Sequence, residues 1–512
     1  MHRATLLATA VASLFLTNTA QAAAYYFTDI GVRSFSRGGA FIAGNDDLTA
    51  LFYNPAALTR LKRPQIMLNV AAVQQSVTFQ RAQIDGAGPL IRDVEDSDWG
   101  EATDVNFEAI KNQAPAYIIP HFGFSSRMGT KNTTFAFGFY PPYAPDLAYD
   151  KDGPQRYSLI DVMVIQTAMG PSVAHQFTDW LSIGAGVSWG VLLAEQQLKI
   201  SVPFHNNQVG LPEIDPETGE LVVPIGDPTP NEDPANDVGF NFSSSDWSGW
   251  SWNAAFLIEP PDGNWAFGFM VQPPVSFHAK GTMEADFSNH ILHTEGVSGD
   301  QIIVSKTAFD KDVTLDITMP LILKGGFAFR PSQRSEIELA GVWQQWSSIE
   351  NITITDLNLQ VDLNGEHQVP AASQEDVIIT DDVVLPAGYR DAWSVRLGGQ
   401  QQITDPFVLR AGLFYEITAV PGATQSVSLI DGNKIGYGIG GGYRANDNWT
   451  FDFGLSQSFL QPTEVTNSEV KQISIDALSG EFLDGTTIGN GTYTSNTLIF
   501  GAGMTYAFGS KG

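Results

Sequence analysis

The sequence predicts an all-β protein: an antiparallel transmembrane β-barrel of about 14 strands, with an N-terminal hatch (plug) in its lumen. Apolar residues alternate with small or polar residues through most of the chain, which is the period of a β-strand. After the N-terminus no apolar run reaches the roughly 18 residues of a transmembrane helix. Short and long connections also follow one another in turn, as they do in outer-membrane barrels. A large exported β-sandwich or propeller is the alternative, although it gives no reason for that regular change of loop length.

The N-terminal residues 1–22 predict a cleaved signal peptide. A basic start, Met1-His2-Arg3, precedes an apolar run from Ala4 to Leu16, and Ala20-Gln21-Ala22 is an A-x-A cleavage pattern. The run is too short to span a bilayer as a helix, which takes about 20 residues. A buried N-terminal helix is the alternative, but no amphipathic pattern follows. We therefore expect an exported protein.

Residues 23–63 do not alternate and are predicted to form the hatch. Gly38-Gly39, Gly44-Asn45 and Asn54-Pro55 are turn and breaker signals within this mixed apolar and charged segment. About fourteen strands enclose a lumen too wide for wall side chains to fill, because eight already leave only a small space. Folding the segment into the lumen solves this problem, whereas a periplasmic tail is the alternative.

Residues 64–512 are predicted to form the barrel with long extracellular loops. In one example strand, Leu181, Ile183, Ala185, Val187, Trp189 and Val191 alternate with glycine and serine. The expected strands are 64–80, 116–126, 132–140, 157–177, 181–200, 248–258, 264–280, 313–330, 334–346, 391–403, 407–418, 433–445, 448–460 and 494–508. Trp180, Trp265 and Trp449 each follow a short turn, which predicts an aromatic girdle at the periplasmic interface.

Composition excludes several classes of function. Lys and Arg number 27 and Asp and Glu number 56, a formal net charge of −29 that excludes a nucleic-acid partner bound through its phosphates. The chain has no cysteine, so a disulfide framework, a thiolate metal site and a cysteine nucleophile are excluded. The histidines are scattered and no G-x-S-x-G elbow occurs, so we expect no enzyme, no catalytic residues, no cofactor and no metal site.

Two expected long loops, 93–104 and 212–237, are rich in acidic residues and proline. We interpret them as solvated loops. Binding of divalent cations or contact with lipopolysaccharide is the alternative, although no EF-hand spacing is present.

Several stretches resemble the FadL/TodX family of outer-membrane channels for long-chain fatty acids and hydrocarbons. The hatch region GVRSFSRGGAFIAGNDDLTALFYNPAAL contains Asn54-Pro55-Ala56, which matches the NPA motif of that family's hatch. The other similar stretches are 171–189, 391–422, 431–459 and 491–496. The chain departs from the pattern at its C-terminus, where Phe508 is followed by four residues instead of ending the chain.

The resemblance implies passive transport of hydrophobic compounds across the outer membrane. Substrate would be captured at external loops, bound in the lumen and released sideways through a gap in the wall, while the hatch blocks the direct route. The implied partners are a fatty acid or hydrocarbon, outer-membrane lipids, lipopolysaccharide and the barrel assembly machinery. A general diffusion porin and a loop-mediated adhesin remain the alternative functions.

A lateral gap needs interrupted strand pairing, and proline removes a hydrogen bond from the ladder. The resemblance implies a kink in the third strand, so we place the candidate gap at Gly138, Phe139, Pro141 and Pro142, beside Asn54-Pro55-Ala56. The alternative is that these prolines only end the strand at the rim.

A carboxylate headgroup would need an inward-facing cation. Alternation selects Lys324, Arg396 and Arg410, with His278 and Lys280 nearer the outer rim. The alternative for each is pairing with an acidic side chain of the lumen or the hatch, such as Asp316, Glu416 or Asp452.

Overall fold

The computed structural model describes most of the chain from residue 29 onwards. The described residues are 29–82, 91–92, 99–100, 107–202, 213–214, 221–222, 232, 234–286, 307–349, 351–355, 359–361, 377–379, 383–386, 388–428, 430–475 and 482–509. The predicted signal peptide and most of the two acidic loops lie outside these residues.

The described strands form a closed antiparallel barrel of 14 strands, two of which are broken into consecutive pieces. Strand β1 (Gln65–Arg81) pairs with β29 (Gly491–Ala507) and so joins the two ends of the sheet. The other wall strands are β5 (Tyr117–Ser126), β6 (Thr133–Tyr143), β8 (Asp161–Gln176), β9 (Leu181–Ser201), β12 (Asp237–Ile258), β13 (Trp265–Gln272) with β14 (Val275–Asp286), β15 (Thr307–Met319) with β16 (Ile322–Ser332), β17 (Ser335–Gln344), β22 (Ala392–Gln402), β23 (Phe407–Ile417), β24 (Lys434–Arg444) and β25 (Trp449–Leu460).

Shorter elements belong to the hatch and to the long connections. The hatch contains α3 (Val32–Phe35), α4 (Ala50–Tyr53) and η1 (Pro55–Arg60). The connections contain β2 (Ile91–Arg92), β3 (Trp99–Gly100), β4 (Ile110–Lys111), β7 (Asp146–Ala148), β10 (Glu213–Ile214), β11 (Leu221–Val222), η2 (Pro234–Asn236), η3 (Trp346–Ser348), β18 (Asn351–Thr355), β19 (Leu359–Val361), β20 (Val377–Ile379), β21 (Val383–Pro386), η4 (Gly422–Thr424), β26 (Thr463–Val465), β27 (Ser474–Ile475) and β28 (Phe482–Leu483).

Each predicted strand has a counterpart in the wall, with two informative differences. The strand predicted to begin at residue 248 begins at Asp237, because the polar run Ser243-Ser244-Ser245-Asp246 separates the alternation of Val238, Phe240 and Phe242 from the rest of the strand. The strands predicted as 264–280 and 313–330 are each broken, at Pro273-Pro274 and at Pro320. Proline cannot donate to the ladder, so it divides a strand at those points.

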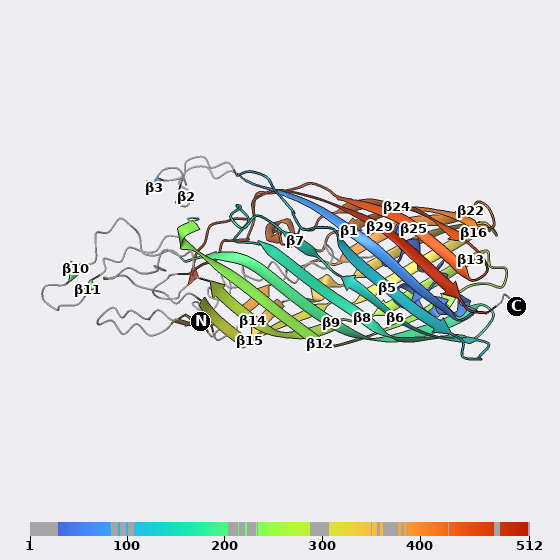
Figure 1. Ribbon diagram of the computed structural model, residues 1–512. Coiled ribbons are helices and arrows are strands. Elements are labelled where there is room, and N and C mark those ends of the chain that lie inside the picture. The colour runs from blue at the N-terminus through green and yellow to red at the C-terminus, as the bar shows by residue number, and fades with distance from the viewer. Residues whose placement is uncertain are drawn as a thin grey trace.

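The short turns gather at one end of the barrel, and the hatch lies inside that same half (Figure 1). An aromatic belt surrounds this short-turn end. The side chain of Trp449 lies 4.7 Å from that of Tyr506 and that of Trp265 lies 5.9 Å from that of Phe327, measured between ring centroids. Trp180 is also exposed on the outer surface. This arrangement matches the girdle predicted at the periplasmic interface.

In the described residues, no helix combines the length and the apolar character needed to cross a bilayer.

Strand β9 shows that the two halves of the wall are built differently. Along its first part Ser182, Gly184 and Gly186 face the lumen, while Ile183, Ala185 and Val187 face outward. Beyond Trp189 the pattern inverts. Apolar Leu192, Ala194, Leu198 and Ile200 then face the lumen, and polar Glu195, Gln197 and Lys199 face outward.

Candidate functional site

Buried ion pairs fix the hatch in the short-turn half of the lumen. The carboxylate of Glu338 on β17 accepts backbone hydrogen bonds from Ile42 at 2.6 Å and from Ala43 and Gly44 at 2.8 Å each. Arg37 of the hatch donates to Glu336 at 2.8 Å. The side chains of Arg37 and Glu338 are fully buried, so each charge depends on its partners for compensation.

The same chain of charges continues to the rim of the barrel. Glu336 accepts from Arg330 at 2.7 Å, and Glu259 accepts from both Arg330 and Arg60 of the hatch. Arg60 also donates to the backbone carbonyl oxygens of Ala43 and Asn45. The hatch is therefore held by charged groups on neighbouring strands, in addition to packing.

The hatch motif Asn54-Pro55-Ala56 lies against β9, β12 and β13. The side chain of Asn54 caps η1 by accepting from the backbone N–H of Ala56 at 3.1 Å, and it donates to the carbonyl oxygen of Phe256 on β12. A Cβ atom at Gly184 would lie 2.4 Å from the backbone nitrogen of Ala56. Only glycine at that wall position lets the hatch approach so closely.

The three predicted headgroup cations are all buried, but their partners differ. Arg396 donates to Asp29 of the hatch at 2.6 Å and lies 3.6 Å from Glu416. Arg410 donates to Asp452 at 2.8 Å. Both guanidinium groups are thus engaged with acidic side chains of the wall or hatch.

Lys324 has a different environment. Its ammonium lies 3.2 Å from the ring centroid of Phe52 and donates to the carbonyl oxygen of Phe52 at 3.1 Å. The side chain is 1% exposed. In the part of the chain that the structure describes, no carboxylate forms an ion pair with it.

His278 and Lys280, expected to point inward, instead lie on the outer surface. The His278 side chain is 68% exposed and contacts Asp316 of the neighbouring strand. The break at Pro273-Pro274 changes which residues face the lumen, from even numbers in β13 to odd numbers in β14.

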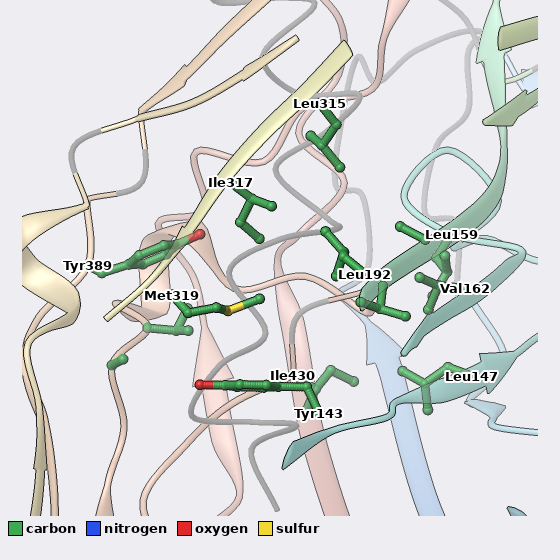
Figure 2. Close-up of a cluster of buried hydrophobic side chains, with 14 of the residues drawn as sticks. Tyr143, Leu147, Leu159, Val162, Leu192, Leu315, Ile317, Met319, Tyr389 and Ile430 are labelled. Carbon is green, nitrogen blue, oxygen red and sulfur yellow. The ribbon is translucent and has the colours of Figure 1, made fainter. Parts of the chain in front are cut away.

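The long-loop half of the lumen is lined by apolar side chains that the sequence analysis did not assign to a site. Val313, Leu315, Ile317 and Met319 of β15 are buried. Polar Thr314, Asp316 and Thr318 alternate with them, a pattern that is also typical of an apolar face toward lipid. Figure 2 shows Leu315, Ile317 and Met319 directed toward the same interior as Leu192, Leu147 and Ile430, which come from distant parts of the chain.

Ion pairs also join the connections at the long-loop end. Arg81 at the end of β1 binds Glu232 at 2.6 Å, and both side chains are 2% exposed. Arg156 donates to Asp237 at 2.7 Å, and the hydroxyl of Tyr157 donates to the same carboxylate at 2.6 Å. Burial raises the pKa of Tyr157 well above its usual value, so the phenol stays protonated.

The wall has an interrupted ladder between β5 and β6. Their pairing runs from Ser126 opposite Phe135 to Phe122 opposite Phe139 and ends there. Beyond that point β5 continues to Tyr117 paired only with β1. On the other edge of β6, the register with β8 skips Pro141-Pro142. Gly138, just before the interruption, faces Leu51 of the hatch, since a Cβ atom there would lie 2.4 Å from Leu51 Cδ1.

Comparisons with known proteins agree with this architecture. The putative outer membrane protein NMB0088 of Neisseria meningitidis serogroup B is 22% identical over 509 residues, which is 96% of each chain. Among solved structures, a FadL homologue of Pseudomonas aeruginosa has a TM-score of 0.68 at 17% identity and covers 95% of this chain and 100% of its own. The toluene transporter TodX of Pseudomonas putida has a TM-score of 0.57 at 13% identity and covers 94% of this chain and 99% of its own. At these identities the structural likeness shows the fold.

The family comparison goes further than the fold. Residues 13–508 match the family described as outer membrane protein transport protein (OMPP1/FadL/TodX), so the match includes the hatch and every wall strand. The chain is therefore a β-barrel of the outer membrane and belongs to the OMPP1/FadL/TodX family of outer membrane transport proteins.

Proposed function

We propose that this protein carries hydrophobic compounds passively across the outer membrane and releases them sideways through its wall. The main support is the apolar lining of the long-loop half of the lumen. The other half is filled by the hatch and contains buried charges. An apolar solute gains about 0.8 kcal/mol for each CH₂ group that leaves water. It therefore enters the apolar half readily and meets a barrier at the hatch.

The capture step is assigned to the extracellular end. The ion pairs of Arg81 with Glu232 and of Arg156 with Asp237 hold several connections together there. These ion pairs favour a defined shape for the extracellular opening of the apolar lumen. The toluene transporter TodX has the same fold and supports a hydrophobic cargo for this chain.

The exit is assigned to the interrupted ladder between β5 and β6, at Gly138, Phe139, Pro141 and Pro142. A closed barrel has no free edge, so a route for cargo into the membrane needs strands whose backbone groups are not paired. β5 and β6 do not pair beyond Phe122 and Phe139, and Pro141 and Pro142 have no N–H to donate to a neighbouring strand. The protein itself would reach the outer membrane after cleavage of residues 1–22 as a signal peptide.

A reversible cross-link tests this exit. Ile119 of β5 and Ala144, just after β6, belong to one apolar cluster across the interruption. We expect the double variant Ile119→Cys, Ala144→Cys to lose most uptake of radiolabelled toluene or laurate when oxidised, and to recover it on reduction. The chain has no native cysteine, so the engineered pair is the sole thiol source.

The matched control is Phe124→Cys, Phe137→Cys, which joins the same two strands where their ladder is continuous. This cross-link should leave uptake unchanged. Equal uptake by the oxidised and reduced Ile119–Ala144 variant, with the disulfide verified by mass spectrometry, would rule out an exit at this position.

For a fatty acid, Lys324 is the proposed headgroup contact, because Arg396 and Arg410 already bind acidic side chains. We expect Lys324→Met to weaken laurate binding about tenfold and to leave toluene binding unchanged. Equal loss for both ligands would assign Lys324 to packing of the hatch. Arg396 and Arg410 are weaker candidates for this contact. Their substitution should mainly destabilise the hatch or the wall, because their acidic partners would lose a counter-charge.

A general diffusion porin or a loop-mediated adhesin is less well supported. An open pore requires a water-filled lumen, whereas the described hatch residues occupy the short-turn half and bind its wall. Low ohmic conductance in planar bilayers is therefore expected and would separate the proposed channel from a porin.

A further inference from the structure

A small cavity lies above the hatch, where three irregular strands meet. Pro142 of β6, Val275 after the Pro273-Pro274 break and Ile322 after the Pro320 break all line it, and Phe52 of the hatch is also part of its lining. The cavity adjoins the interrupted ladder, because Tyr143 lines it and pairs with Gln166 after the register shift in β6. Its walls are mixed, because Gln166, Ser188, Ser251 and Gln272 line it together with the apolar residues.

Gln166 of β8 brings an unused hydrogen-bond acceptor to this cavity. The side chain lines the cavity and is 6% exposed. Its Nε2 donates to the carbonyl oxygen of Thr167 at 3.1 Å. Its buried Oε1 has no hydrogen-bond partner among the residues that the structure describes.

The bond to Thr167 fixes the orientation of this amide. Exchanging the nitrogen and oxygen would place Oε1 against the Thr167 carbonyl oxygen, and two acceptors repel each other. The carbonyl of Gln166 therefore remains the group available for a donor. A buried acceptor without a donor is unfavourable, so a ligand that supplies a donor gains an advantage.

A second polar group comes from β12, which is separated from β8 by β9 alone. Ser251 of β12 lines the same cavity, and its buried hydroxyl oxygen also has no partner within the described ranges. A serine hydroxyl both donates and accepts. An alcohol or phenol between the two side chains can thus donate to Gln166 and accept from Ser251.

We infer that this cavity is a subsite for the hydroxyl group of an otherwise apolar compound, whose O–H donates to Oε1 of Gln166. The inference rests on the proposed transport of hydrophobic compounds and names a preferred chemical class within it. A plain hydrocarbon supplies no donor, so it leaves the acceptor unpaired. The site therefore favours a phenol or fatty alcohol over the hydrocarbon of the same skeleton.

The test compares p-cresol with toluene, which differ by one hydroxyl group, on the purified full-length barrel in detergent. We expect wild type to bind p-cresol about tenfold more tightly than toluene. This ratio is corrected for the ratio in which the two compounds partition into detergent alone. Gln166→Met should reduce this preference to about one. Gln75→Met is the matched control, because Gln75 is also 6% exposed but does not line the cavity, and it should keep the preference.

The wild-type protein gives an independent measurement if Gln166→Met does not fold. The methyl ether of p-cresol lacks the donor, so it should bind no more tightly than toluene. Equal binding of p-cresol and its ether, or a preference that persists in Gln166→Met, would overturn the subsite while transport of hydrophobic compounds stands. Binding of none of the three compounds would overturn the proposed function as well.

Discussion

The short-turn and long-loop halves of the barrel carry their apolar side chains on opposite sides of the wall. In the short-turn half of β9 the outward residues are apolar and the lumen residues are small, whereas beyond Trp189 Leu192 and Leu198 point inward and Glu195 points outward. A wall in lipid needs an apolar exterior, and a wall in water needs a polar one. The inversion therefore marks where the barrel leaves the membrane and stands in water with an apolar interior.

The two halves also hold their contents by different forces. Glu336 and Glu338 of β17 hold the hatch through an ion pair with Arg37 and hydrogen bonds from its backbone, which are directional. Leu315 instead belongs to a large cluster of buried apolar side chains among the described residues. Apolar contact is not directional and can accept varied hydrophobic molecules. A fixed plug thus lies beneath a surface suited to passing cargo.

Removing the main anchor of the plug should have the largest effect. Glu338→Gln leaves Arg37 without one buried counter-charge and weakens three backbone hydrogen bonds. We expect a loss of about 3–5 kcal/mol in the free energy of unfolding and a rise in ion conductance through the loosened hatch. Urea unfolding and planar-bilayer conductance measure these two quantities.

The control is Asp405→Asn, which removes the 3.4 Å pair with Arg334 at the exposed rim. Both side chains are exposed, so the expected cost is below about 1 kcal/mol. If Glu338→Gln behaves like this control, the hatch is held by packing and the contrast between the halves disappears.

The position of the membrane boundary can be tested on the outer face of β9. Ala185→Arg places a charge on the lipid-facing part, where the expected cost is about 2–4 kcal/mol near the bilayer midplane. Gln197→Arg, on the same face beyond the inversion, should cost almost nothing. Folding free energies in lipid vesicles give the comparison, and equal costs would contradict a boundary near Trp189.

Strand positions were predictable because alternation survives in every wall strand, but the inside and outside faces were not. Pro273-Pro274 and Pro320 each shift the alternation by one residue, so His278 was assigned to the wrong face. Sequence period alone also cannot tell an apolar face toward lipid from an apolar face toward the lumen. The polar partners Thr314 and Asp316 were the signal that could have resolved this ambiguity.

The candidate site was predictable to different degrees. Arg396 and Arg410 were expected to face inward, because they alternate with apolar residues, and both side chains are buried. The pairing of Arg396 with Asp29 was not predictable, since it joins residues 367 positions apart through the fold of the hatch. Gln166 had no sequence signal, because its proposed role follows from a cavity where three irregular strands meet.

The two halves of the lumen differ in polarity, and a charge placed in the apolar half tests this difference. Leu315→Asp puts a charge into the apolar half, where it lacks the compensating partners that such groups have near the hatch. We expect uptake of toluene or laurate to fall more than tenfold, because the cargo must pass a hydrated carboxylate. The neighbouring Asp316→Leu changes the outer face, where Asp316 contacts exposed His278, and should leave uptake near the wild-type rate. Both variants are compared at equal amounts of heat-modifiable barrel. Comparable losses of uptake would show that transport does not depend on which face of β15 is changed. The apolar lumen would then no longer explain transport.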